Sequence, residues 1–568
     1  MIRALLLCVL AAGLTGPASG QKTDSQNLLW HITLPLEETG GKHPDTLALY
    51  QVQSLQKQGY LLAATDSVLV TSTQLDIFVS KGPRFYYLLT AGSIDSGIIE
   101  RLRLQSFFND SPIDFAQYDK LTETLLTHYG KTGYPFARVY NTGISIESPL
   151  IRAQFNVNPM DYVVFDTISI SGNAEIRRFF LENHLSIYPG DAFNQEKAEK
   201  AADRLVELDF VRLNGPLQMS FSPGKASLMI PLEKVNASRF DGLVGFASDE
   251  RTDNNFQITG LLNMMLVNAF GMGEYLELAW QAPGNNTQIL NINGTYPYPL
   301  RLPVRTELTF SLHRQDSTWL QLSSRPAIIT ETSWGNVGAF MHYSKGSLIS
   351  TARYRQGNIS PTNLDFTTRL YGLEFQRNTP AFRQNLLRRG YALKVSAAAG
   401  NSIIHQNSNL PQAIYGDIAL KSLQLNTYLH ARKRWSIASQ GTFAMGLKSA
   451  YMNGEKIPEN QLFREGGFNS LKGFDELSLL ASAYVWADAE YRFFTGNRSF
   501  FSLLVNGGWY ERNSRSGYFN DWPLAAAAGI NLESPAGIFA LYFALGGSRN
   551  IPLEFRNGKI HVGYINTF

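Results

Sequence analysis

The segment TELTFSLH, from Thr306 to His313, decides the fold class of this 568-residue chain. Leu308, Phe310 and Leu312 alternate with polar residues, so a β-strand here would carry apolar side chains on one face and polar ones on the other. The segments GEYLELAW (273–280) and KIHVGYINTF (559–568) repeat this alternation. Alternating segments of about ten residues, separated by turn residues, are typical of transmembrane β-barrels.

The same pattern fills residues 237–568, and we expect an antiparallel transmembrane β-barrel of about 16 strands there. Closure of a barrel pairs every backbone group in the membrane and leaves no sheet edge in lipid. A soluble β-sandwich is the alternative, but it would not need so long an unbroken series of strands. No run of about 18 apolar residues follows residue 20, so no transmembrane helix is expected.

Residues 1–20 have the features of a secretory signal peptide: a basic start, a short apolar core and small residues at the exit. The only cysteine, Cys8, lies inside this segment, so the mature chain should contain no disulfide and no thiolate metal site. The net charge of +3 is spread along the chain, which gives no indication of nucleic-acid binding.

Residues 21–236 mix helical and strand patterns and contain internal echoes. KQGYLLAATD (57–66) and KTGYPFARVY (131–140) share Lys, Gly, Tyr and Ala at equal offsets, and FYYLLTAGS (85–93) is echoed by VVFDTISISG (163–172). The first two of these segments begin 74 residues apart, and repeats at such a period predict stacked copies of one small α/β module. We expect three modules, over 21–84, 85–160 and 161–236, and a helix that begins at Asp191 in the third.

Together these features resemble the outer-membrane assembly-factor superfamily that includes BamA and TamA, over essentially the whole mature chain. Its soluble modules are called POTRA domains. NAFGMGE (268–274), YPYPL (296–300) and GINLESPAGIFALYFALG (529–546) are similar to turns and hairpins of the superfamily's barrel. The resemblance implies α+β periplasmic POTRA modules followed by the barrel, in the outer membrane.

The most specific match is EGGFNSLKGF (465–474), which resembles a glycine-rich loop that folds into the barrel lumen in this superfamily. The superfamily has arginine where this chain has Lys472, and an inward aspartate where this chain has Asn506. Asp488 and Glu490 share one strand face, and we expect one of them to neutralise Lys472. The expected loop residues are Gly466, Gly467, Phe468, Leu471, Lys472, Gly473 and Phe474, with Asp488, Glu490 and Asn506 as candidate partners in the wall.

The resemblance also implies a weak lateral seam between the first and last barrel strands. Glycines weaken strand pairing, and they occur at Gly242 and Gly245 in the first strand and at Gly563 in the last, which ends at Phe568.

By resemblance, the expected function is insertion of outer-membrane proteins: the modules receive client β-strands and the seam templates their entry into the bilayer. The alternatives are a two-partner-type secretion pore that exports one dedicated substrate, and a diverged paralogue with a narrow set of clients. The expected partners are unfolded outer-membrane proteins, the lipid bilayer, and periplasmic chaperones or accessory lipoproteins, with no nucleic acid. No catalytic motif is present, so we expect no enzyme activity, no cofactor and no metal.

Overall fold

The structure is a computed structural model that describes residues 29–35, 43–71, 73–248, 256–284, 287–355, 360–379, 388–467, 470–534, 537–549 and 551–567. The expected signal peptide, Phe468 and Phe568 lie outside the described residues. The chain divides into two compact units. One contains residues 1–164, 192–196 and 222–225, and the other contains residues 165–191, 197–221 and 226–568.

The first unit begins with a three-stranded sheet in the order β1-β3-β2, covered by one described helix. Its β1 runs antiparallel to β3, and Leu55, Ile77 and Val79 are buried between the helix and the sheet. The elements are β1 (Leu29–Pro35), α2 (Pro44–Lys57), β2 (Ala64–Val70) and β3 (Gln74–Ser80).

A second sheet in the same unit has the order β4-β6-β5, and here the first strand runs parallel to the last. Helix α4 packs Leu121 and Leu125 onto it, and begins at a capping box in which Asp114 and Gln117 each bind the other's backbone N–H. The elements are β4 (Tyr86–Ala91), α3 (Ser96–Arg101), η2 (Gln105–Phe107), α4 (Phe115–Lys131), β5 (Arg138–Glu147) and β6 (Leu150–Asn158).

The sequence echo between residues 57–66 and 131–140 corresponds to one repeated turn. Gly59 and Gly133 follow the ends of α2 and α4 with φ of 98° and 100°, a left-handed conformation that favours glycine. The next residue closes the same hydrogen bond in both copies, from Tyr60 N to Leu55 O (3.1 Å) and from Tyr134 N to Tyr129 O (2.9 Å).

A third sheet has the order β7-β10-β8, with β9 also paired to β10. The elements are β7 (Val164–Ser171), α5 (Arg178–Leu185), α6 (Gln195–Val206), β8 (Val211–Leu213), β9 (Gln218–Ser222) and β10 (Lys225–Lys234). The prediction that a helix begins at Asp191 is wrong, because Ala192 forms a bridge with Val164 and α6 starts only at Gln195. The three sheets fall within the ranges expected for three modules, whose identity as POTRA domains stays a prediction.

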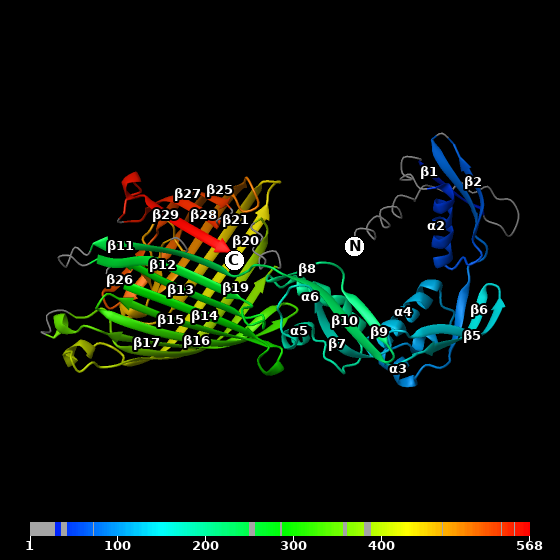
Figure 1. Cartoon of the computed structure of the whole chain (residues 1–568), viewed down its shortest axis with the longest axis horizontal. Helices are drawn as coiled ribbons and strands as arrows, with labels where there is room; N and C mark the ends of the chain where they lie inside the picture. Colours follow the sequence, from blue (N-terminus) through cyan, green and yellow to red (C-terminus); the bar gives the residue numbers. More distant parts are fainter. Residues whose placement is uncertain are drawn as a thin grey trace. The chain divides into compact units, whose positions relative to one another are not determined.

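The rest of the second unit is a closed antiparallel barrel, as the alternating pattern predicted (Figure 1). Its connected path contains seventeen strands, but β25 pairs directly with β27 over Phe500–Gly507, and β26 pairs with the last residues of β25, Tyr510–Ser514. The continuous wall therefore has sixteen strands, in agreement with the expected number.

The strands of the wall are β11 (Arg239–Ser248), β12 (Phe256–Val267), β13 (Tyr275–Gly284), β14 (Thr287–Pro297), β15 (Val304–Gln315), β16 (Trp319–Thr332), β17 (Gly335–Leu348), β18 (Phe366–Asn378), β19 (Gly390–Ile404), β20 (Lys421–Ser436), β21 (Gly441–Met452), β24 (Ala483–Phe494), β25 (Phe500–Ser514), β27 (Leu524–Ser534), β28 (Gly537–Gly547) and β29 (Lys559–Thr567). Short elements in the connections are β26 (Gly517–Asp521), η3 (Pro299–Arg301), η4 (Ala352–Tyr354), η5 (Gln412–Tyr415) and η7 (Phe555–Asn557).

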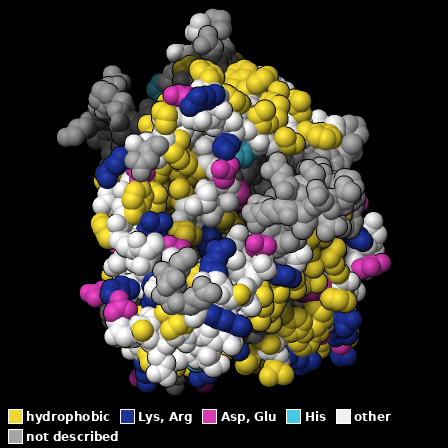
Figure 2. Space-filling view, turned by 90° about the vertical axis from the view of Figure 1, so that its left-hand side faces the viewer, with side chains coloured by type: hydrophobic (Ala, Val, Ile, Leu, Met, Phe, Trp, Pro, Cys, Tyr) yellow, Lys and Arg dark blue, Asp and Glu magenta, His cyan; other side chains and the backbone are white. Residues whose placement is uncertain are grey.

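The two ends of the barrel differ in their connections. The turn end includes the β12–β13 and β14–β15 turns, and the loop end includes the long connection between β21 and β24. Figure 2 faces the loop end, where Lys, Arg, Asp and Glu side chains lie over the mouth and hydrophobic side chains gather along the rim. Among the described helices, none is long and apolar enough to cross a membrane.

Candidate functional site: the lumen loop, the seam and the third-sheet contact

The connection between β21 and β24, residues 453–482, is the glycine-rich segment that the sequence singled out; we call it the lumen loop. It contains η6 (Glu459–Gln461) and a hairpin of β22 (Phe463–Glu465) and β23 (Leu479–Ala481). The expected glycines Gly466, Gly467 and Gly473 have φ of 108°, 92° and 98°. Glycine adopts this region without steric cost, which allows the chain to reverse sharply between β22 and β23.

One side of the lumen loop is fastened to strands β16 to β20. The Gln461 amide nitrogen lies 2.9 Å from Thr368 Oγ1 on β18, 3.0 Å from Ser402 Oγ on β19 and 2.8 Å from Gln424 Oε1 on β20. These three wall residues are buried polar groups, so each needs a partner inside the barrel. The Arg464 guanidinium also lies 5.0 Å from the centre of the Trp319 ring on β16.

The tip of the lumen loop packs against the opposite part of the wall. Leu471 and Phe474 are buried in a cluster with wall residues that include Tyr484, Trp486 and Tyr510. Gly473 lies so close to the wall that a Cβ there would come 2.9 Å from both Ala525 Cβ and Gly546 N. The loop therefore crosses the lumen, because its two sides contact strands from β16 to β28.

Asn506 holds the backbone of Lys472. The Asn506 amide accepts a hydrogen bond from Lys472 N (2.8 Å) and donates one to Ala525 O (3.3 Å). The Lys472 Nζ lies 5.4 Å from the centre of the Tyr542 ring, within the range of a cation–π contact. The role of Asn506 as a candidate partner of the Lys472 side chain stays a prediction.

Glu490 and Asp488, the other candidate partners, belong to an arginine-rich group. Glu490 pairs with Arg432 (3.0 Å) and Arg492 (2.7 Å) and accepts a hydrogen bond from Ser502 (2.7 Å). Asp488 pairs with Arg432 at 3.3 Å. A buried carboxylate requires such charged and hydrogen-bonding partners. Neutralisation of Lys472 by Glu490 or Asp488 stays a prediction.

A further anchor, which the sequence did not reveal, is Glu465 at the base of the loop. Lys448 Nζ lies 2.8 Å from both Glu465 oxygens, and the Ser470 hydroxyl donates to the same carboxylate at 2.6 Å. Lys448 and Arg432 were missed because each is an ordinary charged residue on a strand. Only the alternation of the strands places both on the lumen side, and no spacing links them to the loop.

The seam between the first and last strands is short. β11 pairs with β12 at ten positions, but among the described residues it pairs with β29 at only two, Arg239↔Thr567 and Phe240↔Asn566. Gly242 and Gly245 follow these positions on β11, and Gly563 precedes them on β29, where it pairs with Ala540 of β28. The predicted seam glycines thus lie on the two seam strands, beyond the paired positions.

Helix α5 contacts the β12–β13 and β14–β15 turns of the barrel within the second unit. Arg177 N donates to Gly271 O at 2.8 Å, and a Cβ at Gly273 would come 2.2 Å from the Phe180 ring. These glycines belong to NAFGMGE, the segment that resembled an early barrel turn. The close approach of α5 explains why glycine occupies position 273.

His184 of α5 makes a polar contact with the β14–β15 turn of the barrel. Its Nε2 lies 3.0 Å from the Arg204 carbonyl, which can only accept, so Nε2 carries the proton. Its Nδ1 then accepts from the Tyr298 hydroxyl at 3.0 Å. Burial is the main cause that lowers the pKa of His184 below 6.5, and it also raises the pKa of Tyr298. Among the described residues, no group of three His, Cys, Asp or Glu side chains is placed to hold a metal ion.

No protein-family model and no curated protein sequence matches the chain. Its fold matches solved structures. CdiB from Escherichia coli is 14% identical, with 93% of this chain and 99% of that chain covered and a TM-score of 0.54. CdiB from Acinetobacter baumannii is 12% identical, with 92% and 99% covered and a TM-score of 0.53.

BamA from Haemophilus ducreyi lacking POTRA domains 1–3 is 14% identical, with 84% of this chain and 99% of that chain covered and a TM-score of 0.45. The chain is a β-barrel protein with N-terminal α+β sheets. Its fold matches that of the two CdiB structures, and the closed antiparallel barrel is the one that the alternating sequence pattern predicted.

Proposed function

We propose that this protein is a member of the BamA/TamA-type superfamily that inserts outer-membrane proteins into the bilayer without enzymatic chemistry. The three N-terminal sheets lie in the periplasm as POTRA modules, and the barrel spans the outer membrane. Its clients are unfolded outer-membrane proteins, and periplasmic chaperones or accessory lipoproteins deliver them.

The short seam is the observation that carries this proposal. Ten paired positions join β11 to β12, whereas two join β11 to β29 among the described residues. Because unpaired backbone groups cost several kcal/mol each in hydrocarbon, a strand edge at the seam gains much by pairing with an incoming strand. A client hairpin can therefore add to this edge, where the native pairing that it replaces is small.

Exposed sheet edges in the first unit support a role in receiving clients. β5 is an edge strand that pairs only with β6 among the described strands. Its Tyr140, Ile144 and Ile146 are exposed although they are apolar. An extended client segment can pair with such an edge through its backbone and place alternate side chains against these residues.

The lumen loop supports insertion through the side of the barrel more than export through its centre. Its anchors extend from Trp319 on β16 to Gly546 on β28, so the loop braces a barrel whose seam is weak. A secretion pore would require this loop to leave the lumen. The secretion pore and the paralogue with a narrow set of clients are the two alternative functions that the experiments must distinguish from general insertion.

A disulfide across the seam tests the proposal. Phe240 and Asn566 are direct partners in the antiparallel pairing, at a separation that suits a disulfide. The chain's only natural cysteine is Cys8, in the expected signal peptide. The protein with Phe240→Cys and Asn566→Cys, reconstituted in liposomes, should insert a urea-unfolded barrel protein when reduced and lose at least tenfold in rate when oxidised.

The matched control joins two strands that need not separate. Leu541 and Val562 are direct partners between β28 and β29, and their cysteine pair should leave insertion unchanged after oxidation. Insertion that continues with the seam locked would contradict the proposal. Export of a substrate through the locked barrel would instead favour the secretion pore.

A further inference from the structure

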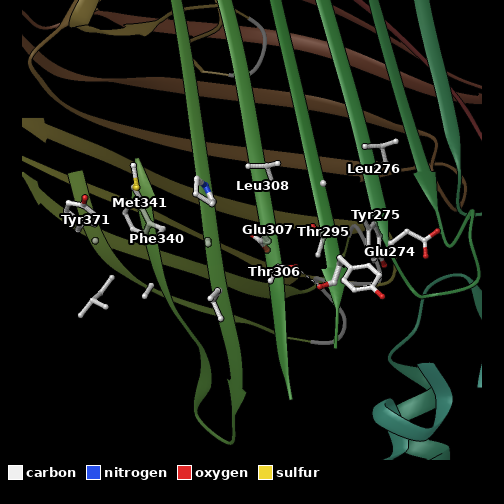
Figure 3. A pocket seen from close by; sticks show the side chains of 18 of the residues that line it. Glu274, Tyr275, Leu276, Thr295, Thr306, Glu307, Leu308, Phe340, Met341 and Tyr371 are labelled. Carbon is white, nitrogen blue, oxygen red and sulfur yellow. Dashed lines mark hydrogen bonds between the residues drawn. The ribbon is translucent and has the colours of Figure 1, made fainter. Parts of the chain in front are cut away.

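A large apolar groove of about 1000 Å³ lies on the wall formed by β13 to β18, away from the seam and the lumen loop. The pairing of the strands places its residues in two adjacent rows. One row contains Leu276, Gly294, Leu308 and Pro326, followed by Met341 and Tyr371 on the next two strands. The other contains Tyr296, Thr306, Ile328, Ala339 and Leu373. Figure 3 shows Leu276 on β13, Leu308 on β15, Met341 on β17 and Tyr371 on β18.

The groove opens on the outer face of the barrel. Leu308, Ile328 and Tyr371 are 54%, 57% and 65% exposed. On β15, Arg305 and Glu307 alternate with Thr306 and Leu308, so their side chains lie on the face opposite Leu308, where they form a 3.0 Å ion pair. The outer face of a transmembrane barrel contacts hydrocarbon, so the groove is continuous with the lipid-facing surface.

Small side chains make the wall concave here. Gly294 and Ala339 lie between the large residues Tyr296, Leu308 and Leu373. A Cβ at Gly294 would meet only Leu308 O, at 4.0 Å, so the space above this glycine is open. The Thr306 hydroxyl donates to Tyr296 O at 3.1 Å, so this hydroxyl already has a hydrogen-bond partner and does not require a polar ligand.

Aromatic and basic residues lie where the groove reaches the turn end of the barrel. Phe270, on the β12–β13 turn, lines the groove and is 65% exposed. The neighbouring turn contains η3, with the fully projecting Leu300 and the exposed Arg301. Aromatic and basic side chains at this level of a barrel match the interface between acyl chains and phosphate headgroups.

We propose that this groove holds one acyl chain of a phospholipid, whose phosphate headgroup lies at the turn end beside Arg301. Most of the lining is apolar and it extends across the strands, which suits a hydrocarbon chain, and the exposed Arg301 on the neighbouring turn is complementary to a phosphate. The volume is at the upper end of the ~300–1,000 Å³ of typical ligand sites. The inference depends on the outer-membrane location and not on the insertion activity.

Native mass spectrometry of the full chain tests this proposal. The protein is stripped of lipid in detergent, and palmitoyl-oleoyl phosphatidylethanolamine is added back. One phospholipid should remain bound to the natural chain at collision energies that remove the rest. Gly294→Leu fills the open space above position 294, and Ala339→Leu fills the second row; each should reduce the retained lipid at least tenfold.

The control is Ala526→Leu, an equal enlargement at an exposed position on the outer face of β27. It should retain the lipid as the natural chain does. Heat-modifiable migration in gels verifies that each variant forms a barrel, and two independent groove variants guard against one misfolded protein. Equal retention by all four proteins, or none by the natural chain, would overturn the proposal. A dimer that Gly294→Leu abolishes would assign the groove to a second copy of the chain instead.

Discussion

Asn506 makes two hydrogen bonds, of which an aspartate, the residue that the sequence resemblance implies at this position, could make only one when ionised. An ionised aspartate only accepts hydrogen bonds, whereas the Asn506 amide both accepts from Lys472 N and donates to Ala525 O. The loop is thus held through its backbone, and its position does not require the charge at residue 472 to pair with residue 506. The Lys472 ammonium is left to interact with its other surroundings, among them the Tyr542 ring.

Gly473→Ala should release the tip of the lumen loop. The new Cβ would come 2.9 Å from Ala525 Cβ and from Gly546 N, at a φ of 98° that a side chain disfavours. Overpacking costs about 1–3 kcal/mol and the left-handed conformation about 1–2 kcal/mol more. Limited proteolysis should therefore cut the loop at least tenfold faster. Gly517→Ala is the control, because its φ is 112° but nothing lies within 4 Å of the added Cβ. Equal rates for both variants would show that the close approach does not hold the loop.

The sequence predicted part of this site and not the rest, for a physical reason. Glycines at 466, 467 and 473 signal a reversal by their residue type alone, and all three have positive φ. Arg432, Arg492 and Lys448 carry no such signal, because lumen charges are common on barrel strands. Their roles arise from the register between strands far apart in sequence, which local patterns do not encode.

At the scale of elements, the alternating sequence pattern predicted the strands of the barrel wall. It did not predict β26 or the true start of α6, which depend on how strands pair. β26 was not expected, since its five residues form a side branch on β25 and lack a full alternating pattern. The start of α6 was misplaced because Asp191 is a good cap by type, but Ala192 is taken into a bridge with Val164. Tertiary contacts override local preference in both cases.

The contact between α5 and the β14–β15 turn should depend on pH. The pKa of His184 is lowered mainly by burial; the hydrogen bond to the Arg204 carbonyl and the charges of Glu331 and Glu207 oppose this effect, and the charge of Arg204 adds to it. Below pH 6.5 the unfolded chain takes up a proton that the folded site resists, so stability present above pH 6.5 is lost as pH falls toward the folded pKa. Urea unfolding followed by the helical circular-dichroism signal, which arises from the N-terminal sheets' helices, should show a lower midpoint at pH 5.5 than at pH 7.5.

Two variants separate this contact from other titrating groups. Tyr298→Phe removes the hydroxyl that binds His184 and should cost about 1–3 kcal/mol at pH 7.5, because a buried nitrogen loses its partner. Tyr371→Phe, at an exposed position on the outer wall, should cost nothing measurable. His184→Gln should reduce the change between the two pH values, and an unreduced change would assign it to other residues.

At the scale of the whole molecule, three features have complementary mechanical roles in the proposed function. The seam has few paired backbone positions. The lumen loop contacts opposite parts of the wall, and α5 binds the β12–β13 turn of the barrel. Loosening the seam therefore need not unfold the barrel. The ties through the loop and through α5 do not depend on pairing between β11 and β29.

Depletion of the protein from its host should show how many clients use this seam. Backbone pairing at an open edge is independent of client side chains, so a general insertion factor should lower the abundance of many outer-membrane barrels together. Quantitative proteomics of the outer membrane measures this, with lipoproteins that contain no barrel as the internal control.

Restoring the natural chain should reverse the loss, whereas the oxidised Phe240→Cys, Asn566→Cys protein should not. Loss of only one or a few proteins would contradict general insertion, and would indicate that side-chain contacts on exposed edges such as β5 select the client.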